Sequence, residues 1–517
     1  MKTKIQEIIT SIITAEDNQT YLTRFWLLRG LGFIYFCVFF PLIFQFKALL
    51  GENGLLPLSL YLEKLSNTYG PDFIWWKRPT LFWLNQSDTF AMVLISLGIF
   101  LSLVVVFGYA NSIIMGLLWL LQLSFTHIGQ TFWSFGWEAN LLELGFLAIF
   151  LCPFLNPRPF LNKLPPSTIL FFFYRWALFR LMLGSGLIKI RGDECWKKLS
   201  CLQYHFETQP IPGPLSSYFH FLPEFFLKSG VVINHIVELI IPWFLFFPSP
   251  FRHFAGIIFL LFQAGIMISG NYAWINYLTI IMIIPCFNDD FLKKLTPQFI
   301  LQKISNQKEK SPLGLKRKVI LTALTTFLLI FSYKPLKNLI GPQQIMNTSY
   351  DQFYFVNSYG LFGGVTKKRY EIVLKGTLDK VITPQTKWIE YSIPCKPGDI
   401  QRTPCILSPY HYRITWQIWF AAMGNYQYNP WLVHWVFKIL HGNDTALSLL
   451  ENNPFPKSPP TFIKADLYQY EFTNPYKGSK VFNWYKRKWI KVYLPPLHKN
   501  HSELINFIQR KKWPIHP

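Results

Sequence analysis

The chain has 517 residues, of which 51% are hydrophobic, 18% aromatic and only 15% charged. Soluble domains contain about 25% charged residues, so this composition argues against an ordinary cytosolic enzyme, and it excludes an intrinsically disordered chain. The formal net charge is +23, and basic residues beside apolar runs are typical of loops next to a lipid bilayer. We therefore expect the bilayer as a partner and no nucleic acid.

Apolar runs recur through the first two thirds of the chain. A bilayer core about 30 Å thick needs about 20 apolar residues per helix, and somewhat fewer inside a bundle. About nine spans are predicted, in a range of about five to nine. The predicted spans are 26–50, 89–107, 111–125, 139–152, 167–190, 231–247, 254–269, 273–287 and 319–332. We expect a cytoplasmic segment at 1–25, a transmembrane helical domain at 26–333 and an extramembrane domain at 334–517.

Lys and Arg residues in the short loops set the expected orientation. The loop 288–318 is the densest basic stretch, and we expect it to be cytoplasmic together with 1–25. The loop 191–230 and the domain 334–517 then lie on the opposite side, which is the lumen of the endoplasmic reticulum in a eukaryote. In a bacterium the protein would lie in the inner membrane and face the periplasm. The loop 191–230 is long and aromatic, as expected of an ordered cap or a functional loop.

The seven cysteines fall into two groups. Three lie in predicted spans and are expected to be packing residues. The other four form pairs that are close in sequence: Cys195 with Cys201 in the outer loop, and Cys395 with Cys405 in the C-terminal domain. We predict a local disulfide in each pair, because the outer compartment permits them. The alternative is four unpaired thiols. Neither spacing is CxxC, so a thioredoxin-like exchange site is not expected.

Ionisable residues inside apolar spans are costly and are normally paired. A candidate polar cluster consists of Arg175, Arg180, Glu238, Glu143 and His235 in the predicted spans and His127 at the end of the third. From the helical rise, Arg180 lies about 13 Å and Glu238 about 10 Å below the outer ends of their helices. An Arg180–Glu238 pair is therefore predicted, which Glu143 can join. We favour an ion pair that fixes the order of the helices; the alternative is a polar pocket that opens outward.

After residue 340, apolar runs give way to an alternation of period two that is typical of strands. The predicted strands are 369–376, 387–393, 411–420, 466–473 and 488–494. Short helices are expected at 429–440 and 445–450. The predicted fold is therefore a polytopic α-helical membrane bundle followed by a mainly β, sandwich-like domain with inserted helices. This domain contains no phosphate-binding glycine loop, GxSxG or HExxH motif, and we predict no cofactor and no metal.

Several long stretches occur in the order that one family of membrane proteins shows. They are FWLLRGLGFIYF, IGQTFWSFGWEANLLELGFLA, RWALFRLMLGSGLIKIRGDECWKKLSCLQYHFETQPIPGPLSSYFHFLP, VNSYGLFGGVTKKRYEIVLKG and NPWLVHWVFKILHG. In these stretches the chain resembles the lipase maturation factor family. The resemblance implies a multi-pass membrane factor, resident in the endoplasmic reticulum of animals, that supports the folding and assembly of secretory clients such as dimeric lipases. It implies no catalytic residues.

The resemblance favours a chaperone-like maturation factor that is not an enzyme. Its outer domain and loop would hold partly folded clients through exposed aromatic surface. Candidate client contacts are His205, Trp416, Trp419 and Trp431, although tryptophans in such a domain are more often part of the core. The alternative is a membrane-embedded enzyme whose outward-facing polar pocket acts on a lipidic, quinone-like or peptide substrate.

Overall fold

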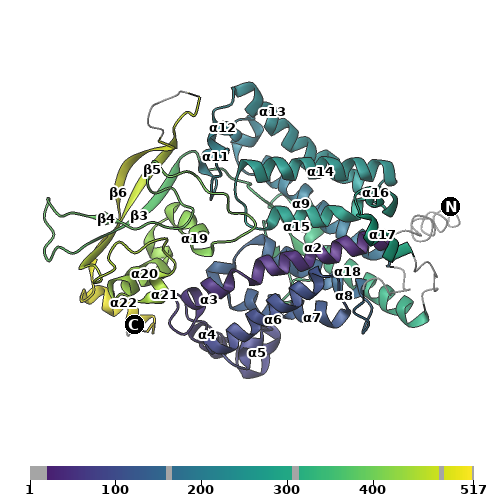
Figure 1. The fold of residues 1–517 in the computed structure, drawn as a ribbon, viewed down its shortest axis with the longest axis horizontal. Helices are drawn as coiled ribbons and strands as arrows, with labels where there is room; N and C mark the ends of the chain where they lie inside the picture. Colours follow the sequence, from purple (N-terminus) through teal and green to yellow (C-terminus); the bar gives the residue numbers. More distant parts are fainter. Residues whose placement is uncertain (1–19, 159–165, 306–313, 477–482, 515–517) are drawn as a thin grey trace.

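The computed structural model describes residues 20–158, 166–305, 314–476 and 483–514. A bundle of long apolar helices forms one part of the molecule, and a small antiparallel sheet with its own helices lies at one end of the bundle (Figure 1). The N-terminal part is thus a helical membrane bundle, and the C-terminal region combines antiparallel sheet with inserted helices, as predicted.

Six helices of the described residues are long and apolar enough to cross a membrane. They are α2 (Tyr21–Phe39), α6 (Asp88–Val106), α9 (Thr168–Arg191), the segment Glu224–Phe246, α14 (Ser249–Ser269) and α18 (Leu315–Ile340). Three shorter helices coincide with the remaining predicted spans: α7 (Ser112–Ile128), α8 (Gly136–Leu151) and α15 (Ile275–Ile283), which η5 (Ile284–Cys286) extends. The predicted span 26–50 is divided, because α2 ends at Phe39 and a separate helix, α3, covers Leu42–Leu50 after Pro41. The other predicted spans correspond to helical segments, and the number of helices that cross the bilayer stays a prediction.

The segment Glu224–Phe246 is not a regular α-helix. It consists of α13 (Glu224–His235), a π-helical turn η3 (Ile236–Ile240) and a 3₁₀ turn η4 (Ile241–Phe246). Pro242 lies in the last of these, and a proline removes a backbone donor from the i→i−4 ladder. π-helical turns inside helices often occur at functional positions, and Glu238 lies in this one.

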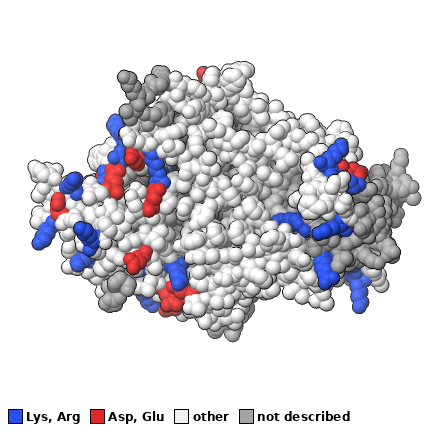
Figure 2. All heavy atoms as spheres, in the orientation of Figure 1, with Lys and Arg blue, Asp and Glu red and all other residues white. Residues whose placement is uncertain are grey.

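Shorter helices cover the two ends of the bundle. Those nearer the sheet include α3 (Leu42–Leu50), α4 (Leu58–Tyr69), α5 (Pro71–Lys77), α11 (Leu202–Thr208) and α12 (Ser216–His220) (Figure 1). Further short helices are η1 (Leu81–Trp83), η2 (Gln130–Trp133) and α10 (Glu194–Lys197). At the opposite end lie α16 (Asp289–Lys293) and α17 (Gln298–Ser305) (Figure 1). On the face that it draws, Figure 2 shows exposed charges towards these two ends and a band almost without charge between them. This distribution suits a bilayer that surrounds the middle of the bundle.

The C-terminal region contains one four-stranded antiparallel sheet in the order β4-β3-β5-β6 and one two-stranded ribbon. The strands are β1 (Thr348–Ser349), β2 (Asn357–Ser358), β3 (Arg369–Thr377), β4 (Ile389–Glu390), β5 (Phe462–Phe472) and β6 (Tyr485–His498). The helices are α19 (Arg413–Ala422), η6 (Tyr426–Tyr428), α20 (Pro430–Leu440), α21 (Asp444–Leu447) and α22 (Ser502–Arg510). Strand β3 pairs with β5 along its whole length, from Arg369 opposite Tyr470 to Thr377 opposite Phe462.

Two predicted strands differ in the structure. The segment 411–420 is mostly helix α19, and 387–393 contributes only the two residues of β4. The alternation in 411–420 was misleading because α19 is buried around most of its circumference. Its polar residues Arg413, Thr415 and Gln417 are as buried as the apolar ones, so apolar and polar positions do not separate into an inner and an outer face.

Candidate functional site at the seam between the bundle and the C-terminal region

A buried ion pair lies where the bundle meets the C-terminal region, an interface that we call the seam. Glu143 of α8 pairs with Arg180 of α9, and their side chains are only 3% and 2% exposed. Residues after position 340 complete the cluster. The backbone N–H of Asn357 donates to Glu143 Oε2 at 3.0 Å, and the Tyr359 hydroxyl donates to the same oxygen at 2.7 Å. Arg180 in turn donates to the Asn357 carbonyl. The charge of Glu143 is therefore compensated from both parts of the chain.

A second pair crosses the seam. Arg413 Nη2 of α19 lies 2.8 Å from Glu138 Oε1 of α8, with both side chains buried. Gln122 Nε2 donates to the other oxygen of Glu138 at 2.6 Å. Arg413 also donates to the Phe132 carbonyl at 2.9 Å, and its guanidinium lies 3.7 Å from the centre of the Trp133 ring. Arg413 thus contacts three groups of the bundle at once: a carboxylate, a backbone carbonyl and the face of an aromatic ring.

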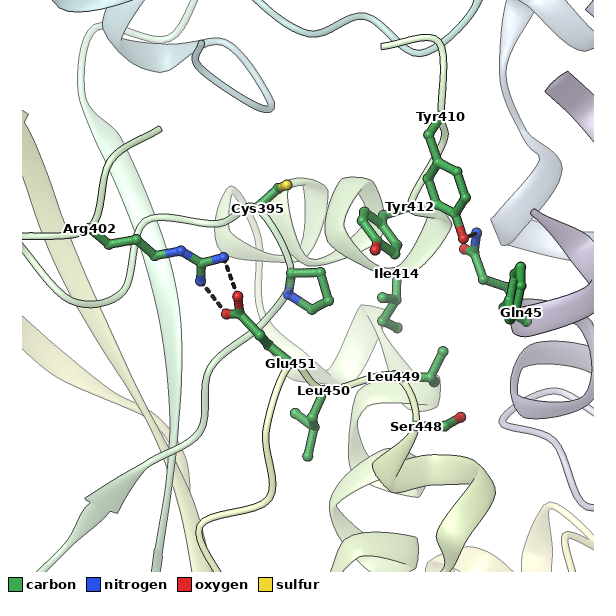
Figure 3. A pocket seen from close by; sticks show the side chains of 12 residues that line it. Gln45, Cys395, Arg402, Tyr410, Tyr412, Ile414, Ser448, Leu449, Leu450 and Glu451 are labelled. Carbon is green, nitrogen blue, oxygen red and sulfur yellow. Dashed lines mark hydrogen bonds and ion pairs between the residues drawn. The ribbon is translucent and has the colours of Figure 1, made fainter. Parts of the chain in front are cut away.

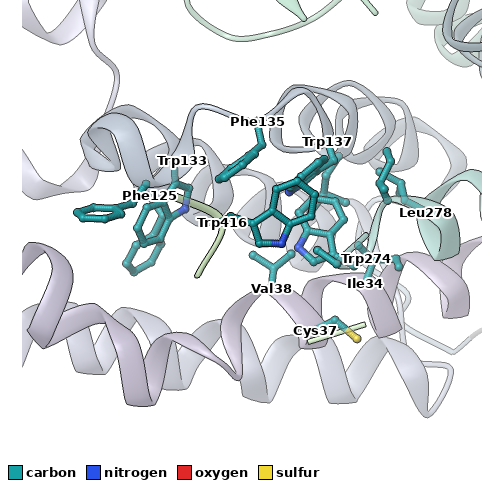
Figure 4. Close-up of a cluster of buried hydrophobic side chains, with 14 of the residues drawn as sticks. Ile34, Cys37, Val38, Phe125, Trp133, Phe135, Trp137, Trp274, Leu278 and Trp416 are labelled. Carbon is teal, nitrogen blue, oxygen red and sulfur yellow. The ribbon is translucent and has the colours of Figure 1, made fainter. Parts of the chain in front are cut away.

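Aromatic side chains fill the seam beside these pairs (Figure 4). Trp416 of α19 lies against Phe135 and Trp137, with ring centroids 5.6 Å and 5.1 Å apart and the rings nearly perpendicular. Trp137 makes a similar edge contact with Trp274, at 6.3 Å. Edge-to-face pairs of this kind contribute about 0.5–1.5 kcal/mol beyond the area that they bury. The seam is therefore packed like a domain interior.

The predicted Arg180–Glu238 pair is wrong. Glu238 instead pairs with Lys189, whose Nζ lies 2.5 Å from Oε1, and Asn234 Nδ2 donates to Oε2 at 3.0 Å. The prediction failed because α13 begins at Glu224 rather than at 231. The helix extends beyond the end of α9 and brings Glu238 to the height of Lys189, which is about 13 Å along the helix from Arg180.

The remaining members of the predicted polar cluster have other neighbours. His127 is buried, and its Nε2 lies 2.8 Å from the Gln352 carbonyl. His235 Nε2 lies 3.1 Å from the Trp196 carbonyl, and Arg175 is half-buried on α9. Two cavities at the sheet end of the molecule, of about 540 Å³ and 660 Å³, are lined by none of these residues. Within the described residues, no group of three or more His, Cys, Asp or Glu side chains is placed to hold a metal ion.

The candidate client contacts are mostly internal. Trp416 is 4% exposed and Trp431 is 2% exposed, so neither can present its ring to another protein. They are buried because α19 and α20 pack against the rest of the molecule. Trp419 is half-buried and donates through Nε1 to the Thr208 carbonyl at 3.0 Å. His205 is also half-buried, with Nε2 2.9 Å from the Tyr272 hydroxyl.

Both predicted cysteine pairs are at disulfide distance. The Cα atoms of Cys195 and Cys201 are 4.7 Å apart, and those of Cys395 and Cys405 are 5.6 Å apart, with the sulfur atoms bonded in each pair. Cys195 and Cys201 are buried, whereas Cys395 and Cys405 are half-buried. The three other cysteines are unpaired and buried.

We expect three reactive thiols in the denatured, unreduced protein and seven after reduction, because four of the seven cysteines are paired. Alkylation followed by mass measurement of the intact chain gives both numbers. A result of seven without reduction would contradict both disulfides, and a result of five would contradict one. Peptide mapping of the alkylated sites then identifies which pair is open.

Glu207 of α11 closes one wall of the 660 Å³ cavity beside the ends of β5 and β6. Its Oε1 accepts the Phe472 N–H at 2.6 Å, and His220 Nε2 lies 3.8 Å from the same oxygen. Lys367, Lys368, Glu471 and Lys486 also line this cavity. Burial raises the pKa of Glu207 to about 7, while the Phe472 N–H acts in the opposite direction. Burial also lowers the pKa of His220.

The raised pKa of Glu207 predicts a pH-dependent stability. The folded protein holds one proton more than the unfolded chain between about pH 4.5 and pH 7. Stability from this group is therefore fully present below about pH 4.5 and is lost as pH rises to about 7, by up to about 3 kcal/mol. Glu207→Gln should remove this loss and melt at a higher temperature than the unsubstituted protein at about pH 8.

Thermal unfolding in detergent at about pH 5 and about pH 8 measures the effect. His220 is present in both proteins, so the difference between them reports the effect of the substitution at position 207. The pKa assignment fails if the two proteins show the same change in melting temperature between these pH values.

Sequence reasoning missed four residues of these sites: Glu138, Lys189, Asn357 and Arg413. Glu138 stands one residue outside the predicted span 139–152, and Lys189 stands at the end of 167–190, where a lysine normally reaches water. Asn357 and Arg413 carry no sign of a bundle contact in their local sequence. The useful signal was the pair of acidic residues, Glu138 and Glu143, in one apolar helix, since each such residue requires a cation or several donors.

An apolar helical bundle, joined through buried ion pairs to a C-terminal region with antiparallel sheet, defines a multi-pass membrane protein with a closely attached extramembrane part. The lipase maturation factor transmembrane domain matches residues 22–294, and the lipase maturation factor C-terminal domain matches residues 355–495. The chain belongs to the lipase maturation factor family.

Curated relatives match along nearly the whole chain. Lipase maturation factor 1 of Mus musculus is 40% identical, over 96% of this chain and 90% of its own length. Lipase maturation factor 1 of Homo sapiens is 38% identical, over 96% and 91%. Lipase maturation factor 2 of Xenopus laevis is 29% identical, over 95% and 84%. No solved structure matches the chain.

Proposed function

We propose that this protein is a membrane-anchored, chaperone-like maturation factor for secreted lipases, and that its C-terminal region meets the client. The match to lipase maturation factor 1 over 96% of the chain, at 40% identity, carries the proposal. The seam supports it, because Arg413 and Asn357 attach the C-terminal region to the bundle. A client held by that region would therefore be held beside the membrane, where exposed apolar segments of folding chains can be shielded.

The surface that would contact the client must consist of exposed side chains. On the described C-terminal region these include Phe420 and Met423 at the end of α19, which are 43% and 44% exposed. Trp489 and Val492 on the edge strand β6 are 52% and 45% exposed. Exposed aromatic and apolar residues of this kind are typical of protein contacts. We propose these four residues as client contacts in place of the buried Trp416 and Trp431.

Restoration of lipase secretion tests the function. The chain is expressed in animal cells that lack their own lipase maturation factor 1, and the activity of a co-expressed secreted lipase is measured in the medium. We expect the chain to restore activity, and the double variant Trp489→Ser, Val492→Ser to restore less at equal protein level. The matched control is Lys488→Ser, Lys491→Ser, which changes exposed residues of the same strand. Failure of the unsubstituted chain to restore any activity would contradict the lipase proposal.

We further propose the expected orientation, with 334–517 in the lumen of the endoplasmic reticulum or in the periplasm and 288–318 in the cytoplasm. Helices α16 and α17 lie at the opposite end of the bundle from the sheet (Figure 1), which supports it. Asp399→Cys and Lys294→Cys place a thiol at an exposed position near each end. In sealed microsomes an impermeant maleimide should label Lys294→Cys and not Asp399→Cys. After permeabilisation of the membrane it should label Asp399→Cys as well. Labelling of both from one side would contradict the orientation.

A further inference from the structure

A groove of about 540 Å³ lies where α3 meets the C-terminal region (Figure 3). Its volume falls within the range of about 300–1000 Å³ that is usual for small-molecule sites. One wall is formed by Phe44 and Gln45 of α3. The remaining lining comes from C-terminal residues, among them Arg402, Tyr410, Tyr412, Ile414, Ser448 and Glu451.

Aromatic rings connect this groove with the outer surface of the first span. The rings of Phe36 and Phe40 stack at 5.2 Å, and the ring of Phe40 meets that of Phe44 at 5.7 Å. These residues are spaced four apart, so they follow one face from α2 into α3. Phe40 is 38% exposed and Phe44 is 60% exposed. The apolar face of a predicted span thus continues without interruption into the groove.

The far side of the groove carries an ion pair of a different kind from those of the seam. Arg402 Nη2 donates to Glu451 Oε1 at 2.7 Å, and the two side chains are 27% and 44% exposed. Figure 3 shows this pair on one side and Gln45 with Tyr410 on the other. The groove therefore has an apolar entrance at Phe44. Its opposite, polar wall presents the positive group of Arg402 next to the negative group of Glu451.

We propose that this groove binds one zwitterionic phospholipid of the outer leaflet. An acyl chain would lie along Phe44 and the apolar lining, the phosphate would face Arg402 and the ammonium group would face Glu451. Arg402 and Glu451 together carry no net charge, so they match a headgroup that also carries both signs. The proposal is independent of the lipase function, because it concerns a ligand supplied by the membrane.

The apolar entrance decides between a lipid and a client segment. A client held by the C-terminal region would reach the groove from solvent, whereas Phe36, Phe40 and Phe44 lead into it from the surface of a span. A lipid enters along such a surface without exposing its acyl chain to water, an exposure that the hydrophobic effect opposes. The aromatic rings and the position of the groove therefore favour a lipid.

Photo-crosslinking in nanodiscs tests the proposal. The purified full chain is placed in phosphatidylcholine nanodiscs that contain a small fraction of phosphatidylcholine with a photoreactive acyl chain. Lipid adducts are then mapped by mass spectrometry. We expect adducts on the peptides that contain Tyr410 to Ile414 and Ser448 to Glu451, in addition to those on the spans. Ser448→Trp, which fills the groove from an exposed position, should reduce the groove adducts about tenfold, the loss that corresponds to about 1.4 kcal/mol.

Control variants and probes distinguish a zwitterionic lipid from other occupants of the groove. Ser458→Trp changes another exposed serine of the same region and should leave the groove adducts unchanged. Equal groove labelling in the Ser448→Trp variant would overturn the proposal, and so would stronger labelling by a phosphatidylglycerol probe, which carries net negative charge. A photoreactive amino acid at position 448 tests the occupant in cells that also express a lipase. An adduct with lipid is expected, and an adduct with the client polypeptide instead would overturn the proposal.

Discussion

Arg180→Met is expected to reduce the free energy of unfolding by about 3–5 kcal/mol, because it leaves the buried Glu143 carboxylate without its cation. The Asn357 N–H and the Tyr359 hydroxyl would still donate to that carboxylate, but neither carries a positive charge. Thermal unfolding in detergent, followed by tryptophan fluorescence, measures the loss. The matched control is Lys197→Met, which breaks an exposed pair with Glu194 and should cost less than about 1 kcal/mol.

The double variant Arg180→Met, Glu143→Gln distinguishes loss of charge pairing from loss of packing. Glutamine keeps a carbonyl oxygen for Asn357 and Tyr359 but carries no charge. We therefore expect the double variant to regain most of the stability that Arg180→Met loses. A double variant as unstable as the sum of the two single variants would contradict the ion-pair account.

Cutting the chain between the bundle and the C-terminal region is expected to leave the two parts bound to each other. A protease recognition sequence can be inserted between Pro342 and Gln343, which are both exposed. Neither disulfide crosses this position, so only non-covalent contacts of the seam would hold the fragments. We expect them to co-elute from a gel-filtration column in mild detergent.

Arg413→Met should weaken this association strongly, because it leaves Glu138 buried beside only the amide of Gln122, at a cost of about 3–5 kcal/mol. The cleaved variant should then separate into two fragments under conditions in which the cleaved parent does not. Separation of the parent fragments would contradict a seam that is packed like a domain interior. It would also indicate that the C-terminal region is an independent domain on a tether.

The sequence predicts well what depends on local pattern. The helices of the bundle follow from apolar run length, and the alternation at 369–376 and 466–473 predicts strands where β3 and β5 lie. The two cysteine pairs are close in sequence, so short loops already bring them together. Each of these features is determined by residues that are near one another in the chain, and for this reason each could be predicted from a single sequence.

The seam could not be predicted in the same way, because it depends on contacts between distant segments. Arg413 meets Glu138 and Asn357 meets Glu143 although hundreds of residues separate them. The alternation in 411–420 indicated a strand, and only the burial of α19 on most sides explains why polar and apolar residues mix there. Trp416 looked suitable for a partner protein and instead fills the internal interface.

The Glu143 cluster has a consequence for how the protein is made. Asn357 follows Glu143 by 214 residues, and translation at about 5–20 residues per second takes about 10–40 s to cover that distance. During this interval the nascent bundle carries an acid whose full set of donors has not yet emerged from the ribosome. A truncated message would yield helices with an incompletely compensated charge inside the bundle, and such chains are suitable substrates for the cell's degradation machinery.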